Sequence, residues 1–419
     1  MRYGNFCLAS LLACVDAACA ASQAPLPSKA DLTPEFNRLG LIPQVQGSDT
    51  CSLHAVASLA EFEIAEREPR PKAERSTEFL IWAAKKATGK DHDQAMFYEA
   101  VCGLNKLGIC REALMPEVPA GHARRPPSAD ALADAKAQSN RWHVHWIKRW
   151  DLKRPLDDVQ LPAIKAALAH GHPVACGLRW PKVLKGCQVI QVPPPAAVED
   201  GHSIALVGYV DDVRDNGGVF LFRNSWGPKW GKNGYGSISY AYTRTYANDA
   251  LWLQLGPPNS ESPLERFEAV SLPVVASSRC QYNVQDMAPW ERAMWSQGKQ
   301  LFCKAEKGGF LELAIEIHKA GLYRFRVLAT AAPDFGTIRI ALDGRWLEPQ
   351  FDLYCGRVSP SGTLELGAHA FTAGRHRIRF GSVSKNAASA GYFFGIDTID
   401  LLPHEPKTGA NQGPLLLPE

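Results

Sequence analysis

The chain has 419 residues, 46% apolar and 21% charged, which excludes a disordered protein and predicts two domains or three. Its 46 basic and 43 acidic residues give a net charge of +3, so the composition indicates no nucleic-acid or anionic-membrane partner. No apolar stretch approaches the roughly 18 residues of a transmembrane segment, and no Cys/His cluster has zinc-ligand spacing, so we expect no metal and no cofactor.

The first residues resemble a secretory signal peptide. Arg2 precedes an apolar run over residues 6–15, and residues 18–20 form an A-x-A cleavage pattern. We therefore predict a signal peptide over 1–20 and a secreted or periplasmic protein. Two alternatives stay open: a lipoprotein signal, because 11–14 (LLAC) resembles a lipobox, and a misassigned start or short buried helix.

Apolar residues at helical spacing dominate the first part of the chain. The predicted helices lie at 51–66, from Ser76 onward, at 96–107 and at 161–170. Strand and turn chemistry follows, with short apolar runs separated by Asn-Gly, Gly-Gly and Pro. These runs are HSIALVGYV (202–210), GVFLFRNSW (218–226) and YGSISYAY (235–242). Helices followed by strands predict an α+β domain over 21–255.

The remainder of the chain has an all-β pattern. Residues 256–265 (GPPNSESPLE) have linker composition, and 404–419 form a Pro/Gly-rich flexible tail. Between them, 266–403 alternate apolar and polar residues in several short runs with turn signals. The runs are LELAIEI, LYRFRVLA, TIRIALD, TLELGA and HRIRFGSV. We predict a jelly-roll sandwich domain.

Three separated patches point to one chemistry. Cys51 follows a polar turn and opens a predicted helix, whose positive end favours the nucleophilic thiolate. His202 opens a predicted strand, and Asn224 precedes Ser-Trp-Gly, where its amide can hold the second imidazole nitrogen. Each residue alone is more often structural. Their order and separations, about 150 and about 20 residues, are those of a Cys–His–Asn triad.

Residues 40–255 resemble the papain-like (cathepsin-type) cysteine peptidases. The resemblance is carried by GHSIALVGYV, by FLFRNSWGPKWGKNGYG and, more loosely, by QG…TCS. It implies a helical left part and a β-rich right part. It also implies that Cys51 is the nucleophile, that His202 forms an ion pair with it and protonates the leaving amine, and that Asn224 orients His202. Trp226 would shield that hydrogen bond, and Gln46 would complete the oxyanion hole with the Cys51 N–H.

Several residues depart from the family pattern. Gln46 lies five positions before Cys51, where the family usually has six, so we expect a displaced oxyanion loop. Ser52 replaces the usual aromatic residue, and the upstream cysteine of the CGSC run, with its disulfide, is absent. Residues 89–94 (GKDHDQ) replace the substrate-pairing Gly-Gly stretch. His54, one turn after Cys51, is assigned to the core rather than to catalysis.

Other polar and aromatic clusters have ordinary structural interpretations. Asp91-His92-Asp93 is interpreted as a solvated turn rather than a metal site. The Trp- and His-rich stretch 142–150 is interpreted as a strand covering a sheet rather than a ligand site. Asp200 is a candidate lining residue of the pocket for the second substrate side chain, where an acid would favour basic side chains.

Residues 266–403 resemble galactose-binding-like β-sandwich modules. The carrying residues are AGLYRFRVLATAAPDFGTIRIALDG, TAGRHRIRF and YFFGIDTIDLLP. The resemblance implies a carbohydrate or surface ligand, with Trp346, Tyr354 and Tyr392 as aromatics that could stack on a sugar. The alternative is that these aromatics fill the sandwich. Three cysteines, Cys280, Cys303 and Cys355, permit at most one disulfide there.

These observations predict an exported cysteine peptidase that acts on protein or peptide substrates and carries a binding module. An amidase or acyl transferase for a non-protein substrate is the alternative within the same fold, because a triad does not specify the acyl group. A third alternative is a carbohydrate- or surface-binding protein whose peptidase domain is a catalytically dead scaffold.

Overall fold

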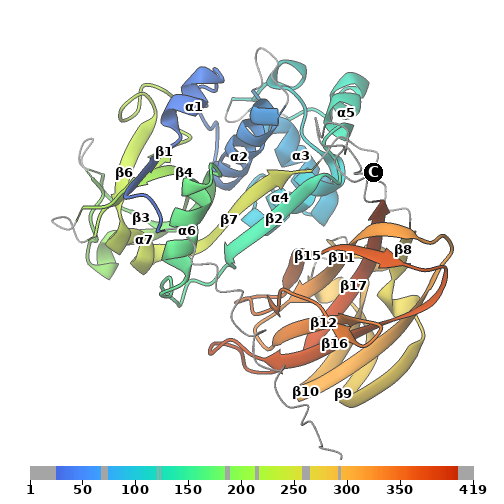
Figure 1. Ribbon diagram of the computed structural model, residues 1–419. Coiled ribbons are helices and arrows are strands. Elements are labelled where there is room, and N and C mark those ends of the chain that lie inside the picture. The colour runs from blue at the N-terminus through green and yellow to red at the C-terminus, as the bar shows by residue number, and fades with distance from the viewer. Residues whose placement is uncertain are drawn as a thin grey trace, which may run out of the picture.

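The computed structural model describes residues 25–67, 74–119, 122, 124–184, 189–212, 217–256, 265–290 and 294–403. The predicted signal peptide, most of the predicted linker and the predicted tail lie outside these residues. Figure 1 shows an N-terminal part with helices and a sheet, and a C-terminal part made of strands. In the part of the chain that the structure describes, no helix is long and apolar enough to cross a membrane.

The predicted helices of the N-terminal part are confirmed within a residue or so. They are α2 (Cys51–Arg67), α3 (Thr77–Thr88), α4 (Phe97–Leu107) and α6 (Gln160–Ala169), joined by the shorter α1 (Thr33–Arg38) and α5 (Ala129–Lys136). Ser76 caps α3, because its hydroxyl accepts a hydrogen bond from Phe79 N–H at 2.9 Å. Helix α2 contacts β3, β4 and β7 of the sheet and also α3 and α4, which explains why it is buried on almost every side.

The described strands of the N-terminal part form one sheet in the order β2-β7-β3-β4-β5-β6, with β1 paired to β4. Its members are β1 (Lys29–Asp31), β2 (Trp142–Lys148), β3 (Val174–Pro181), β4 (Val198–Val210), β5 (Val219–Arg223), β6 (Tyr235–Ser239) and β7 (Ala247–Leu255). The predicted Trp-rich strand is therefore confirmed as β2. The strand predicted through Tyr242 is wrong in its last residues, because Ser239 ends β6 and caps α7 (Tyr240–Tyr246).

The C-terminal part contains a second sheet, in the order β13-β12-β16-β10-β17-β11-β15. Strands β14, β8 and β9 pair with β12, β17 and β10, respectively. The bounds are β8 (Glu265–Glu268), β9 (Val274–Asp286), β10 (Lys299–Ile317), β11 (Gly321–Ala331), β12 (Thr337–Leu342), β13 (Arg345–Trp346), β14 (Phe351–Asp352), β15 (Ser359–Phe371), β16 (Gly374–Ser384) and β17 (Phe394–Pro403). The all-β prediction is confirmed, and the jelly-roll topology stays a prediction.

The two parts contact each other through β2 and the residues that follow it. His143 Nδ1 lies 2.7 Å from Glu365 Oε1 of β15, and the Tyr354 hydroxyl donates to Asp151 Oδ2 at 2.8 Å. An apolar cluster also spans the boundary. It comprises Tyr98, Met287, Met294 and Trp295, with Met96, Cys102, Trp146, Trp290 and Val358 packed against it. The C-terminal part is thus attached to the N-terminal part by both polar and apolar contacts.

Candidate active site

Cys51 occupies the first position of α2, as its sequence context predicts. The polar segment 44–50 runs into this helix end, and the side chain of Cys51 projects beside β4. The residue is 8% exposed, and its sulfur lies 3.9 Å from the carbonyl oxygen of Gly201. Since Gly201 directly precedes His202, the nucleophile candidate and the base candidate are neighbours in space although 150 residues separate Cys51 from Gly201.

Strand pairing brings His202 and Asn224 together. His202 lies on β4, Asn224 follows β5, and these two strands are antiparallel neighbours. The His202 Nε2 atom is 2.8 Å from Asn224 Oδ1, which also accepts the Ser225 N–H at 2.9 Å. The second bond identifies the amide oxygen, so Nε2 must carry the hydrogen. The neutral imidazole therefore keeps Nδ1 free to accept a proton.

Burial shifts the pKa values of both groups. Burial raises the pKa of the Cys51 thiol, and hydrogen bonds with Ser203 and Ser52 oppose that rise. Burial lowers the pKa of His202 to about 4, while the bond to Asn224 acts in the opposite direction. Both shifts favour the uncharged forms. Two effects oppose these pKa shifts. The positive end of α2 stabilises a Cys51 thiolate, and proton transfer from Cys51 to His202 creates a thiolate and an imidazolium that attract each other.

Two tryptophans enclose the imidazole of His202. The Trp226 ring stacks on it with centroids 4.8 Å apart, and the Trp180 ring meets it edge-on at 4.5 Å. Trp226 follows the Asn224-Ser225 pair, whereas Trp180 comes from β3, which pairs with β4. The sequence predicts a shielding role for Trp226 only. Trp180 stands in no recognisable motif, and only the β3–β4 pairing places it here.

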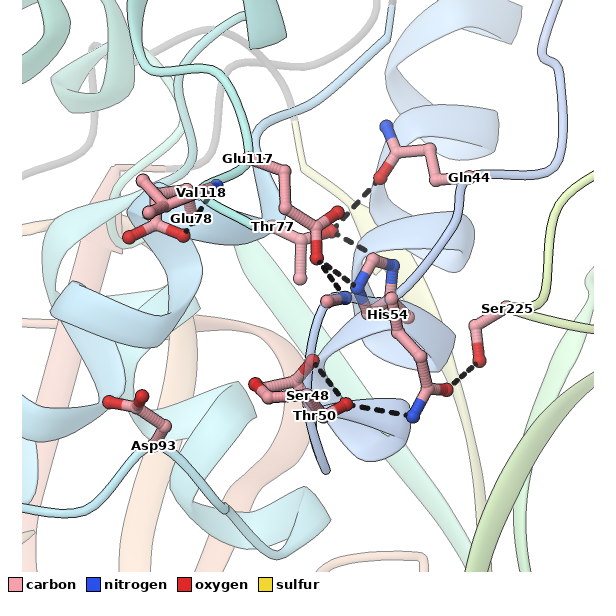
Figure 2. A network of polar contacts seen from close by, with 12 residues as sticks. Gln44, Ser48, Thr50, His54, Thr77, Glu78, Asp93, Glu117, Val118 and Ser225 are labelled. Carbon is pink, nitrogen blue, oxygen red and sulfur yellow. Dashed lines mark hydrogen bonds and ion pairs between the residues drawn. The ribbon is translucent and has the colours of Figure 1, made fainter. Parts of the chain in front are cut away.

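Gln46 lies in the loop before α2 and is attached to the segment after Asn224. Its backbone N–H donates to Ser225 O at 2.8 Å, and its side-chain oxygen accepts from the Ser225 hydroxyl at 2.5 Å. The Gln46 amide nitrogen donates to Ser48 O at 2.8 Å. Figure 2 shows Ser48, Thr50 and Ser225 around this loop. One hydrogen of the Gln46 side-chain amide is thus bonded within the loop, and the second can be donated to a ligand.

Cys51 and His202 line one cavity of about 640 Å³, which Gln46 and Trp226 also border. The cavity is acidic at its edges and contains no Lys or Arg among its described lining residues. Its three carboxylates are Asp49, Glu199 and Asp249. Residues 94–97 also line the cavity, and Gln94 is the last residue of the segment that replaces the Gly-Gly stretch.

Asp249 was missed by sequence reasoning because it stands in a β-strand without a motif. It is 5% exposed, and burial raises its pKa to about 7, although Lys148 and the Gly177 N–H act in the opposite direction. Lys148 is itself buried, and its ammonium donates to the backbone oxygens of Asp151, Arg154 and Ala247. Asp249 therefore supplies a carboxyl group at the cavity wall that titrates near neutral pH.

The other candidate residues of the N-terminal part have local partners. Lys85 lies 3.2 Å from both Asp91 and Asp93, and Arg124 lies 2.8 Å from Asp93. These contacts make the loop an ion-paired turn, and no metal-type cluster of three His, Cys, Asp or Glu occurs among the described residues. The side chain of Asp200 lies outside the described part of the structure.

The aromatic candidates of the C-terminal part have different surroundings. Tyr354 contacts the N-terminal part through Asp151, so it neither fills the sheet's core nor lies open to a sugar. Trp346 is 39% exposed and lies under the Arg339 guanidinium, 5.4 Å from its ring centre. Tyr392 lies 5.2 Å from the Lys385 ammonium. Cys280, Cys303 and Cys355 are free thiols.

Comparison with known proteins bears on the N-terminal part. The model of the papain family of cysteine proteases matches residues 130–250, which include His202 and Asn224 but not Cys51. A peptidase C1-like protein of Acanthamoeba polyphaga mimivirus is 26% identical over 201 residues, 46% of this chain and 62% of that protein. The chain thus spans less than two thirds of this relative's length.

Solved structures with similar folds include xylellain, a cysteine protease from Xylella fastidiosa. It is 26% identical with a TM-score of 0.45, and the match covers 56% of this chain and 88% of xylellain. The cysteine protease and lectin-like domains of Cwp84, a surface-layer-associated protein of Clostridium difficile, are 14% identical with a TM-score of 0.48. That match covers 90% of this chain and 79% of the Cwp84 chain.

The family match includes His202 and Asn224, and the fold places Cys51, the first residue of α2, beside Gly201. Residues 130–250 of this chain therefore match a papain-family cysteine protease domain.

Proposed function

We propose that this protein hydrolyses peptide bonds with Cys51, His202 and Asn224, and that Gln46 stabilises the oxyanion. The observation that carries the proposal is the hydrogen bond from His202 Nε2 to Asn224, made beside Cys51 at the wall of one cavity. A fixed tautomer with Nδ1 free is what a base needs to accept the thiol proton.

The reaction follows from this arrangement. The Cys51 sulfur attacks the carbonyl carbon, the thiol proton moves to His202 Nδ1, and the carbonyl electron pair moves to oxygen. The Cys51 N–H and the free hydrogen of the Gln46 amide donate to that oxyanion. His202 then protonates the amine as the C–N bond breaks and leaves a thioester. Water, deprotonated by His202, attacks the thioester and releases the acid and the Cys51 thiol.

The acidic cavity supports a preference for basic substrates. Asp49, Glu199 and Asp249 border it, and none of its described lining residues is Lys or Arg. A Lys or Arg side chain near the scissile bond would find a complementary charge there. Asp249 is one acid that these contacts support, and Asp200 stays a candidate from the sequence.

We also propose the roles that the sequence suggests for the whole chain. Residues 21–255 would form the peptidase domain and 266–403 a binding module, with export directed by residues 1–20. Trp346, exposed on the C-terminal part, is the aromatic that supports a carbohydrate ligand. A glycan array probed with the full chain tests this ligand, and equal binding by Trp346→Ala would count against it.

The first test is the pH dependence of Cys51 alkylation, followed by peptide mass spectrometry. An ordinary thiol, with a pKa of about 8.5, reacts slowly below about pH 7. We expect Cys51 to remain reactive well below that pH, and His202→Ala to abolish this acid reactivity.

Cleavage of a peptide library, lost in Cys51→Ala, separates a peptidase from the alternatives. Acid reactivity without any peptide cleavage would favour the amidase or acyl transferase. A thiol-like profile that is the same in His202→Ala would favour the catalytically dead scaffold.

A further inference from the structure

A buried polar pair lies behind the loop that carries Gln46. His54, on α2 one turn after Cys51, is 4% exposed, and its Nε2 lies 3.2 Å from Glu117 Oε1. The same carboxylate oxygen accepts the Gly47 N–H at 2.8 Å. Figure 2 shows the side chains of Glu117 and Thr77 next to the His54 ring, each with a dashed line to it. Neither His54 nor Glu117 touches the proposed reaction directly.

Polar side chains contact both ring nitrogens of His54. Gln44 Nε2 donates to Arg75 O at 3.3 Å, and Gln44 Oε1 accepts from the Thr77 hydroxyl at 3.1 Å. His54 Nδ1 lies 3.4 Å from Thr77 Oγ1, and Nε2 lies 3.2 Å from Glu117 Oε1. The imidazole therefore connects Thr77 of α3 to Glu117.

The backbone of Glu117 is held as well. The Glu117 N–H donates to Glu112 Oε1 at 2.9 Å, and Glu112 begins the short helix η1 (Glu112–Leu114). The side chain of Glu117 is 17% exposed. Charge-assisted hydrogen bonds at such sites are stronger than neutral ones. Glu117 thus links η1 and α2 to the backbone of the loop at Gly47.

The loop is held from both sides. Ser225 holds Gln46 through two hydrogen bonds, and Glu117 holds the next residue, Gly47, from the opposite side. Compared with the family pattern, this loop is one residue shorter and lacks the upstream cysteine. The hydrogen bonds to Ser225 and Glu117 are therefore the contacts that hold the Gln46 amide in position. The hydrogen bond from the amide to an oxyanion depends on that position.

We propose that the His54–Glu117 contact is a positioning device for the oxyanion loop, and that Glu117 acts on catalysis through Gly47 and Gln46. This inference rests on the proposed function. Because the loop stabilises charge that exists only in the transition state, Glu117 contributes to kcat and not to substrate binding.

The test compares Glu117→Ala and Glu117→Gln with the matched control Asp134→Asn in the full chain. Asp134 accepts the Arg111 N–H at 2.8 Å and Arg111 Nε at 2.9 Å, a similar pair away from the cavity. We expect Glu117→Ala to lower kcat about 10- to 100-fold, below the roughly 100- to 1000-fold cost of deleting an oxyanion donor. Glu117→Gln should keep part of the activity, since its amide oxygen can still accept from Gly47. Asp134→Asn should leave kcat unchanged.

Two further measurements separate positioning from general damage. A peptide aldehyde forms a hemithioacetal whose oxygen uses the oxyanion hole, so its affinity should fall in parallel with kcat. Iodoacetamide alkylation of Cys51 needs no oxyanion hole, so its rate should not change. Wild-type kcat in both Glu117 variants, or an equal loss of alkylation, would overturn the proposal. A wild-type chain that cleaves no peptide would refute the proposed function and this inference with it.

Discussion

At the scale of single residues, the environment of His202 is set by aromatic contacts as much as by its triad partners. Burial between Trp226 and Trp180 excludes water from the bond to Asn224 and lowers the pKa of His202 to about 4. The sequence could indicate Trp226, since it stands two residues after Asn224. It could not indicate Trp180, whose position follows from strand pairing alone.

Trp226→Ala should therefore expose the imidazole and, in a Cys51→Ala background where no thiolate–imidazolium pair forms, raise the pKa of His202 from about 4 towards its ordinary value. With water competing for the Asn224 bond, we expect kcat to fall about tenfold, the equivalent of roughly one hydrogen bond. NMR titration of the His202 ring and peptide hydrolysis measure the two effects. The control is Trp230→Ala, because Trp230 packs on Trp226 with ring centroids 5.4 Å apart. An unchanged His202 titration in Trp226→Ala would contradict the shielding role.

At the scale of elements, periodicity predicted the helices well but missed a strand that tertiary pairing forms. Helix α2 was predicted at 51–66 from its apolar spacing, and its contacts with the sheet and two helices also bury Glu61 and Glu63, which that spacing does not indicate. Strand β9 was not predicted, since its side chains are mostly exposed and carry no apolar alternation. Hydrogen-bonded pairing with β10 nevertheless makes this segment a strand.

A stack of rings on the sheet gives a prediction at this scale. His145 of β2 stacks on Trp252 of β7 at 3.8 Å, and burial lowers its pKa to about 4. The unfolded chain binds this proton at about pH 6.5 and the folded chain only near pH 4, so the folded state loses stability as pH falls between these values.

His145→Phe keeps a ring against Trp252 but cannot titrate. We expect similar free energies of unfolding at pH 7.5, and a variant more stable than the wild type by up to about 2 kcal/mol at pH 5. Urea denaturation at both pH values measures the difference. A difference independent of pH would show that the stacking itself, and not protonation, is what the substitution changes.

At the scale of the whole molecule, the C-terminal part contacts residues that border the catalytic cavity. Trp150 and Leu152 line that cavity. The Gly356 N–H donates to Trp150 O at 3.2 Å, and the Tyr354 hydroxyl bonds to Asp151 between them. A side chain at position 356 would lie 2.8 Å from Trp150 O, so only glycine permits this approach.

Tyr354→Phe removes one hydroxyl from this contact. We expect the free energy of unfolding to fall by about 1 kcal/mol, the typical value of one hydrogen bond, and KM for peptides to rise while kcat is nearly unchanged. Tyr323→Phe is the matched control, because its hydroxyl donates to Lys319 O within the C-terminal part. It should reduce stability similarly and leave KM as it is. Equal KM values in the two variants would contradict a role for the C-terminal part in shaping the cavity.

Local sequence patterns predicted the proposed chemistry and the class of each part. Cys51, His202 and Asn224 could be proposed as nucleophile, base and orienting amide because each role needs a particular residue type in a particular local setting. The surroundings of these residues follow from tertiary contacts instead. Trp180, Asp249 and the His54–Glu117 pair come from elements that are distant in the chain, where no local spacing records their contacts. The contact of Tyr354 and Gly356 with the cavity wall is likewise set by the packing of the two parts.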